Sequence, residues 1–122
     1  MELYKELRND IDWRTVGAVN PVKDQGMCGS CWAFATASTL ESGHFLHSGV
    51  LYNLSEQQFV DCAGGDYGNL GCDGGFPAFA YMYSDENKIV SAAEYPYTSG
   101  YNGTVGNCTY DPALGLVRAN GF

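Results

Sequence analysis

Apolar residues are most concentrated after Cys31, where the next ten residues include no glycine or proline and are apolar on nearly every side. This pattern predicts a buried helix that begins at Cys31, continues to about Ser48 and carries Trp32 and Phe34 into the core. Gly49 is expected to end the helix, because glycine readily adopts the left-handed conformation that terminates helices.

Two shorter helices are predicted further along the chain. The sequence Ser55-Glu56-Gln57-Gln58 has the form of a capping box, which opens a helix that runs into Cys62. Pro77 suits the first turn of a third helix over residues 78–84, because proline is well tolerated only where a helix begins.

The remaining segments are predicted to be mostly loops. Glycines clustered within residues 64–75 indicate an ordered irregular backbone, and the chain beyond Glu94 reads as loop until residues 117–122, which are expected to begin a strand. We interpret residues 1–11 as an N-terminal arm and residues 12–122 as part of one domain, a length that suits a single core.

Composition excludes several classes of function. Lys and Arg number 6 and Asp and Glu number 14, which gives a formal charge of −8 and a pI near 4.4. Nucleic-acid and anionic-lipid surfaces require clustered basic residues, so neither is an expected partner. No apolar stretch approaches the ~18 residues of a membrane span, and the first residues have no apolar signal-peptide core, so neither a membrane segment nor a leader is predicted.

The chain has five cysteines, an odd number that leaves one thiol free if the others are paired. Two other interpretations remain open at this point. Cys28 and Cys31 have the spacing of a redox pair, although the βαβ pattern expected around such a pair is absent. Those two residues with Cys62 and Cys72 have acceptable ligand types for zinc, but the 62–72 spacing is not that of a close ligand pair.

The segment around Cys31 suggests acyl-transfer chemistry. A thiolate in the first turn of a helix is stabilised by the helix dipole and by unpaired N–H groups. The Cys31 N–H can donate to an oxyanion that forms when the sulfur attacks a carbonyl. Gln25 lies six residues earlier, across a loop with two glycines, and its side-chain amide can supply a second donor.

The same segment, Cys-Gly-Ser-Cys-Trp, resembles the local signature of papain and the cathepsins. Further blocks of the papain family follow in the family's order, over roughly residues 12–122. They are Asp12-Trp13-Arg14, Gly17-Ala18-Val19, Pro21-Val22-Lys23-Asp24-Gln25-Gly26, Trp32-Ala33-Phe34, Leu54-Ser55-Glu56-Gln57, Val60-Asp61-Cys62, Gly71-Cys72-Asp73-Gly74-Gly75 and Tyr95-Pro96-Tyr97.

The resemblance implies an α+β fold, of which this chain would form the helix-rich lobe with long glycine-rich loops. It implies a peptidase that acts through a thioester on Cys31, with Gln25 in the oxyanion hole and no cofactor or metal. It also implies disulfides between Cys28 and Cys72 and between Cys62 and Cys108. The implied substrate-binding residues are Gly29, Gly74, Gly75, Phe76 and Pro77.

The chain departs from the family in lacking the catalytic base. The family places a histidine and an asparagine ~130–150 residues after the cysteine, and this chain ends at Phe122. His44 and His47 lie in the same predicted helix as Cys31, roughly 20 and 24 Å away at ~1.5 Å per residue, so neither is expected to act on it. We therefore expect the chain alone to be inactive. The alternatives are a truncated non-catalytic fragment and a half-site that binds peptides or inhibitors.

Other expectations follow from the resemblance. Partners would be peptide or protein substrates, a C-terminal lobe and cystatin-like inhibitors, and the location would be lysosomal, vacuolar or extracellular. Three sequons would matter in a secreted chain, at Asn53, Asn102 and Asn107. The tyrosines at 81, 83, 95 and 97 are expected to pack their rings and leave their hydroxyls in water.

Overall fold

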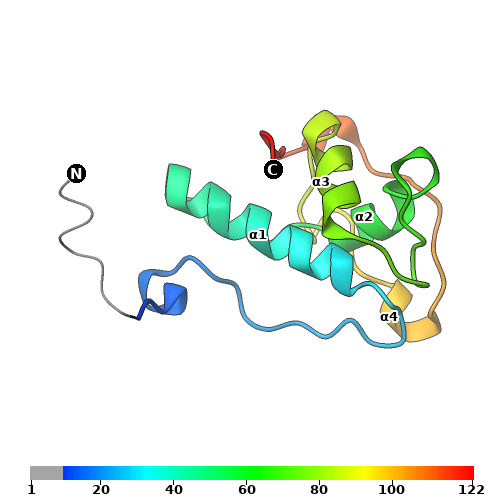
Figure 1. The fold of residues 1–122 in the computed structure, drawn as a ribbon, viewed down its shortest axis with the longest axis horizontal. Coiled ribbons are helices and arrows are strands. Elements are labelled where there is room, and N and C mark those ends of the chain that lie inside the picture. Colours follow the sequence, from blue (N-terminus) through cyan, green and yellow to red (C-terminus); the bar gives the residue numbers. More distant parts are fainter. Residues whose placement is uncertain (1–9) are drawn as a thin grey trace.

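Helix α1, Cys31–Ser48, is the longest element of the computed structural model, which describes residues 10–122 (Figure 1). Helices α2, Glu56–Cys62, and α3, Pro77–Glu86, both pack against it. The core between them is built from Trp32, Ala33, Ala37, Leu54, Phe59, Val60, Ala80, Tyr83, Ile89 and Val117. The short elements are η2 (Trp13–Val16), η3 (Gly65–Tyr67), α4 (Ser99–Asn102) and η4 (Pro112–Leu114).

The limits of α1 are those predicted from the sequence. Gly49 follows the last residue with a φ of +79° and donates its N–H to the Phe45 carbonyl at 2.7 Å. The predicted burial of the helix holds for only part of its length. Its buried residues lie within the first three turns, Ala35 is exposed, Phe34 is only partly covered, and the last turns extend toward solvent.

Helix α2 uses only half of the predicted capping box. The Ser55 hydroxyl accepts the Gln58 N–H at 3.0 Å, as a capping serine does. The Ser55 N–H, however, donates to the Val90 carbonyl rather than to Gln58. The buried Gln58 side chain donates instead to the Tyr83 hydroxyl and the Lys88 carbonyl and accepts the Val90 N–H. The pattern therefore located the helix start but not the role of its glutamine.

Helix α3 starts at Pro77 and continues to Glu86, slightly beyond the predicted residues 78–84. The predicted strand at 117–122 does not form, and residues 10–122 contain no strand, only isolated bridges. One of these pairs Ile89 with Val117, and the Ile89 N–H donates to the Val117 carbonyl at 2.7 Å. The predicted loop beyond Glu94 also contains the short helices α4 and η4.

Two disulfides connect the loops to the helices. Cys28 is bonded to Cys72 and Cys62 to Cys108, the pairs implied by the family resemblance. The first joins the segment before α1 to the glycine-rich loop. The second joins the end of α2 to the segment between α4 and η4. Because their sequence intervals overlap, the two bridges are interlaced along the chain.

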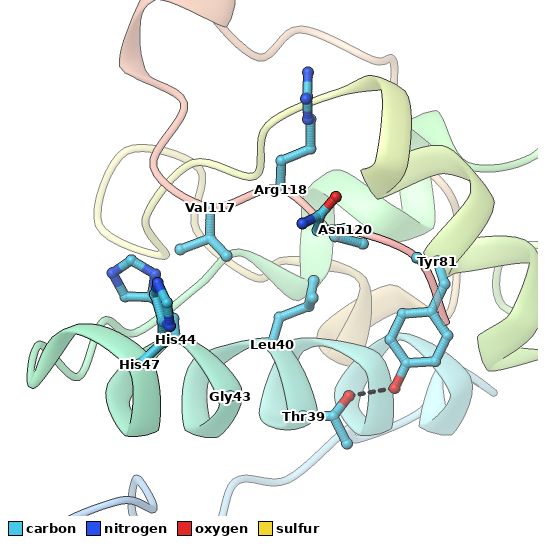
Figure 2. Close-up of a pocket in the computed structure, with 11 residues that line it drawn as sticks. Thr39, Leu40, Gly43, His44, His47, Tyr81, Val117, Arg118 and Asn120 are labelled. Carbon is cyan, nitrogen blue, oxygen red and sulfur yellow. Dashed lines mark hydrogen bonds between the residues drawn. The ribbon is translucent and has the colours of Figure 1, made fainter.

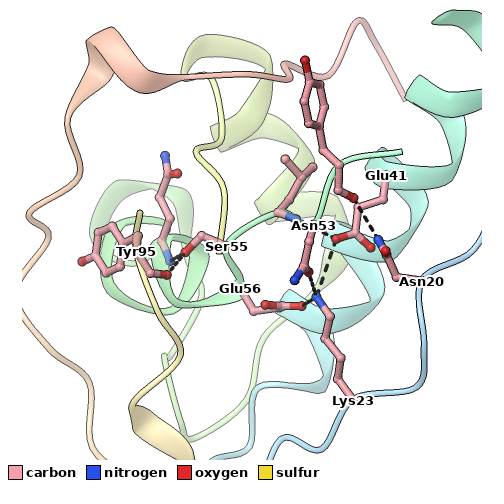
Figure 3. A network of polar contacts seen from close by, with 10 residues as sticks. Asn20, Lys23, Glu41, Asn53, Ser55, Glu56 and Tyr95 are labelled. Carbon is pink, nitrogen blue, oxygen red and sulfur yellow. Dashed lines mark hydrogen bonds and ion pairs between the residues drawn. The ribbon is translucent and has the colours of Figure 1, made fainter. Parts of the chain in front are cut away.

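A polar network holds the extended segment before α1 against the helices (Figure 3). The carboxylates of Glu41 and Glu56 are both nearly buried and share one cation, Lys23, whose Nζ lies 3.6 and 2.5 Å from them. Lys23 also donates to the Asn53 side chain. Glu41 in addition accepts the Leu54 N–H at 2.7 Å. These contacts fix the path of the chain toward Gln25.

None of the helices within residues 10–122 is both long enough and apolar enough to cross a bilayer.

Candidate active site

The Cys31 thiol is free and exposed at the first residue of α1. The preceding residue, Ser30, is fully buried and uses its carbonyl to accept the N–H groups of Ala33 and Phe34. The Cys31 N–H is among the first N–H groups of the helix, which have no partner inside it. The structure thus presents a thiol and an N–H donor together at an open helix end.

Gln25 reaches this end of the helix from the loop before it. Its side-chain Nε2 donates to the Cys28 carbonyl at 3.0 Å, and the residue is half-buried. A side-chain amide carries two N–H groups, so the bond to Cys28 orients the amide and leaves the second N–H for a ligand.

The loop that carries Gln25 lies unusually close to α4. A Cβ on Gly26, whose φ is +65°, would come within 2.6 Å of the Gly100 carbonyl oxygen. The Met27 N–H donates to that same oxygen at 2.9 Å. Only glycine permits so close an approach with this backbone conformation, so the position of the loop depends on Gly26.

The glycines proposed to contact substrate differ in their surroundings. A Cβ on Gly29 would lie 2.5 Å from the Cys72 carbonyl oxygen, and one on Gly75 would lie 2.9 Å from the indole of Trp32. Both are therefore required by internal packing. Gly74 has a φ of +114°, and a Cβ there would meet open space, although its carbonyl already accepts the Leu70 N–H at 2.9 Å.

Phe76 and Pro77 lie where the glycine-rich loop enters α3. The Phe76 ring is 65% exposed and packs edge-on against Phe79 at 5.6 Å between centroids. Its N–H donates to the side-chain oxygen of Asn69, which is itself buried and donates to the Ala63 carbonyl. Asn69 is not predictable from the sequence, because a bond across seven residues of irregular loop leaves no local pattern.

The two histidines lie at the opposite end of α1 from Cys31. They line a pocket of about 370 Å³ between α1 and the C-terminal segment around Val117 (Figure 2). The His44 ring also stacks on Tyr52, with centroids 5.2 Å apart. Neither histidine is placed to exchange a proton with the Cys31 thiol.

The disulfide pairing of the cysteines excludes the redox-pair and zinc-site interpretations. Cys28 pairs with Cys72 rather than with Cys31, and Cys62 is also in a disulfide. Within residues 10–122, no group of three or more His, Cys, Asp or Glu side chains is arranged to hold a metal ion.

The three sequons lie in different settings. Asn53 is bonded through its side chain to Lys23, and the Ser55 hydroxyl of the same sequon is buried against the Tyr95 carbonyl. Asn102 and Asn107 are exposed. Asn53 is exposed as well. The engaged Asn53 side chain and the buried Ser55 hydroxyl, rather than exposure, therefore favour the two later sites as glycan acceptors.

The tyrosine hydroxyls are not simply in water, contrary to expectation. Tyr83 accepts a bond from Gln58, Tyr95 donates to Asp61 at 2.6 Å, and Tyr97 donates to the Gln25 carbonyl at 2.5 Å. The last of these contacts belongs to the candidate site and was missed, because the two residues are 72 positions apart in the sequence.

Comparison with known proteins gives consistent matches. Residues 7–120 match the papain family cysteine protease domain. Digestive cysteine proteinase 1 of Homarus americanus is 55% identical over 94 residues, which cover 76% of this chain and 29% of that protein. Procathepsin L of Rattus norvegicus is 43% identical over 121 residues, which cover 98% of this chain and 35% of that protein.

A solved structure shows the same fold. Digestive procathepsin L 3 of the Tenebrio molitor larval midgut matches with a TM-score of 0.81 and 40% identity, over 88% of this chain and 34% of that chain. The helix-rich part of a papain-like fold is therefore what residues 10–122 form. The chain spans only 29% to 35% of the length of the relatives named here.

Proposed function

The chain belongs to the papain family of cysteine proteases, and we propose that it supplies the nucleophile and the oxyanion donors for hydrolysis of peptide bonds in peptides or proteins. One observation carries this proposal. The free, exposed thiol of Cys31 lies at the N-terminal end of α1, where a helix N–H and the oriented amide of Gln25 are available as donors.

The proposed reaction begins with attack of the Cys31 thiolate on the carbonyl carbon of the substrate. A C–S bond forms, the carbonyl π electrons move to oxygen, and the Cys31 N–H and Gln25 Nε2 stabilise that oxyanion. Collapse then breaks the C–N bond and leaves a thioester on Cys31. Water attacks the thioester, which releases the carboxylic acid and restores the thiol.

Breaking the C–N bond requires a proton for the departing amine. This requirement limits which substrates the isolated chain can turn over. A general acid must lie within hydrogen-bond reach of the leaving group. His44 and His47 are at the far end of α1, and residues 10–122 place no histidine beside Cys31. We therefore propose that amide substrates are not turned over by this chain unless a second lobe supplies the histidine and its orienting asparagine.

Substrate binding is assigned to the glycine-rich loop. Gly74 has open space where a Cβ would lie, so an extended peptide can approach its backbone, of which the carbonyl already accepts the Leu70 N–H. The exposed ring of Phe76, followed by Pro77, suits an apolar side chain of that peptide. Gly29 and Gly75 contribute by allowing the loop to pack closely enough to place these groups beside Cys31.

Cellular context is proposed from the family alone. A lysosomal, vacuolar or extracellular location is compatible with two disulfides, which persist in oxidising surroundings. Glycans are proposed at Asn102 and Asn107 rather than at Asn53. Cystatin-like inhibitors are proposed to bind the same surface as substrate, beside Cys31 and the glycine-rich loop.

An activated ester tests the proposal without needing the missing acid, because p-nitrophenolate leaves without being protonated. With the p-nitrophenyl ester of N-acetyl-phenylalanyl-glycine, we expect one acyl group on Cys31, detected by intact mass and peptide mapping. The matching p-nitroanilide should not be cleaved. The Gln25→Ala variant should acylate about 10²-fold more slowly.

The Cys31→Ala variant and the urea-unfolded chain are the controls. If the unfolded chain is acylated at the same rate, Cys31 reacts only as an ordinary thiol and the proposal is overturned. Reversible peptide binding without acylation would instead support the half-site alternative.

A further inference from the structure

The Tyr97 hydroxyl lies between the two segments that form the candidate oxyanion hole. It donates to the Gln25 carbonyl oxygen at 2.5 Å and lies 2.8 Å from the Ser30 hydroxyl. Gln25 carries the side-chain donor, and Ser30 immediately precedes the Cys31 N–H. One phenol therefore contacts the residues that hold both donors.

The direction of these bonds is set by chemistry. A carbonyl oxygen can only accept, so Tyr97 gives its single hydroxyl proton to Gln25. Ser30 must then donate its own proton to the Tyr97 oxygen, because its other acceptor, the Cys28 carbonyl, is 3.4 Å away. The result is a chain of bonds that runs from Ser30 through Tyr97 to Gln25.

The Tyr97 ring is itself held firmly. Phe34, in the first turn of α1, packs edge-on against it with centroids 5.0 Å apart. A Cβ on Gly100 would come within 2.8 Å of the ring, so the backbone of α4 lies directly against it. Burial raises the pKa of the Tyr97 hydroxyl, which therefore keeps the proton that it donates.

We propose that Tyr97 is a positioning residue that joins the Gln25 amide and the Cys31 N–H into one rigid oxyanion hole. The inference rests on the proposed function, because it concerns the same site. It adds a residue from a segment 67 positions after Ser30 that touches neither the sulfur nor the substrate. Loss of the hydroxyl should loosen both donors while leaving the thiol in place.

A peptide aldehyde separates the oxyanion hole from the thiol. The Cys31 sulfur adds to the aldehyde carbon, the carbonyl π electrons move to oxygen, and the thiol proton is transferred to that oxygen. The resulting hemithioacetal has no leaving group and places its oxygen where the donors point. Iodoacetamide alkylates the same sulfur by displacing iodide and uses no oxyanion donor.

We expect Tyr97→Phe to weaken binding of N-acetyl-phenylalanyl-glycinal by up to about tenfold, the upper end of the net effect of one lost neutral hydrogen bond. The rate of iodoacetamide alkylation should stay within about twofold, since the helix end that holds the thiol is unchanged. Ser30→Ala, which removes the other end of the bond chain, should show the same selective loss. Tyr101→Phe, at a side chain that is 88% exposed, is the matched control and should change neither value.

Gln25→Ala distinguishes failure of this inference from failure of the proposed function. If Gln25→Ala weakens aldehyde binding but Tyr97→Phe and Ser30→Ala do not, the role assigned to Tyr97 is wrong and the oxyanion hole stands. If Gln25→Ala has no effect, the oxyanion hole itself is wrong. Equal losses in aldehyde binding and alkylation by Tyr97→Phe would indicate a merely structural role and would also overturn the inference.

Discussion

The indole of Trp32 lies so close to Gly75 that a Cβ at position 75 would be 2.9 Å from the ring. The same indole donates its N–H to the Gly71 carbonyl at 3.0 Å. Trp32 directly follows Cys31, so this one side chain fixes both ends of the glycine-rich loop against the helix turn that carries the thiol. The loop is thereby placed from inside the protein before any substrate arrives.

Gly75→Ala should therefore lower the free energy of unfolding by about 2 kcal/mol, because the added methyl group would lie 2.5 Å from the Asn69 side-chain oxygen and 2.9 Å from the indole and would force one of them or the loop to move. Gly43→Ala is the matched control. Gly43 lies within α1 with open space around it, and alanine there should raise stability by about 0.5–1 kcal/mol. Urea unfolding measures both changes, and a shift of the same sign in the two variants would contradict this account.

Removal of the cation that Glu41 and Glu56 share should be costly. Lys23→Met leaves the carboxylates of Glu41 and Glu56 nearly buried without a counter-charge, and we expect a loss of about 3 kcal/mol. Adding Glu56→Gln to this variant should restore part of the loss. Arg14→Met breaks an exposed pair with Asp12 and should cost less than about 1 kcal/mol. Equal losses of stability in Lys23→Met and Arg14→Met would show that the Lys23 network contributes no more than an exposed ion pair.

Stability should decline above about pH 10, where tyrosines of the unfolded chain ionise. Burial raises the pKa of Tyr83, Tyr95 and Tyr97, so the folded protein keeps protons that the unfolded chain releases. The unfolded state then binds fewer protons, and the free energy of unfolding falls as pH rises.

Urea melts between pH 8 and 11 measure this slope. They require the Cys31→Ser variant, since a thiolate would exchange with the disulfides. Tyr83→Phe should reduce the slope, and an unchanged slope would assign the effect to other groups.

The disulfide between Cys62 and Cys108 encloses 46 positions of sequence. Replacing both residues with alanine should lower stability by about 4 kcal/mol, because the unfolded chain regains the entropy of that loop. In the unchanged protein, alkylation without reductant should label Cys31 alone. Peptide mapping that finds Cys31 in the main disulfide species would show that the pairing described here is wrong.

Local signals in the sequence located the three longest helices, α1, α2 and α3. Gly49 and Ser55 were identified as helix ends because a left-handed glycine and a capping serine act within a few residues. The roles of Gln58 and Tyr97 were not predictable, because each depends on partners brought close only by the tertiary fold. The strand predicted at Val117 failed for a related reason, since a single bridge to Ile89 satisfies its backbone there.

The candidate site likewise combines residues that a local motif indicates with features that only the tertiary packing determines. The family resemblance assigns candidate roles to Cys31 and Gln25 from a short motif, because the two residues lie in one continuous segment. It did not indicate that Gly74 is open while Gly75 is filled by the indole, a distinction that depends on side-chain packing. Assigning Cys31 as nucleophile remains a prediction until acylation is measured.

The interlaced disulfides give the chain tolerance to being cut. The bridge from Cys28 to Cys72 spans any break in its own interval, and the bridge from Cys62 to Cys108 spans the rest as far as residue 108. A single nick anywhere between residues 28 and 108 thus leaves two pieces that are still covalently one molecule. A protein built in this way can lose a peptide bond in an exposed loop and still keep the helix end, its thiol and the glycine-rich loop joined.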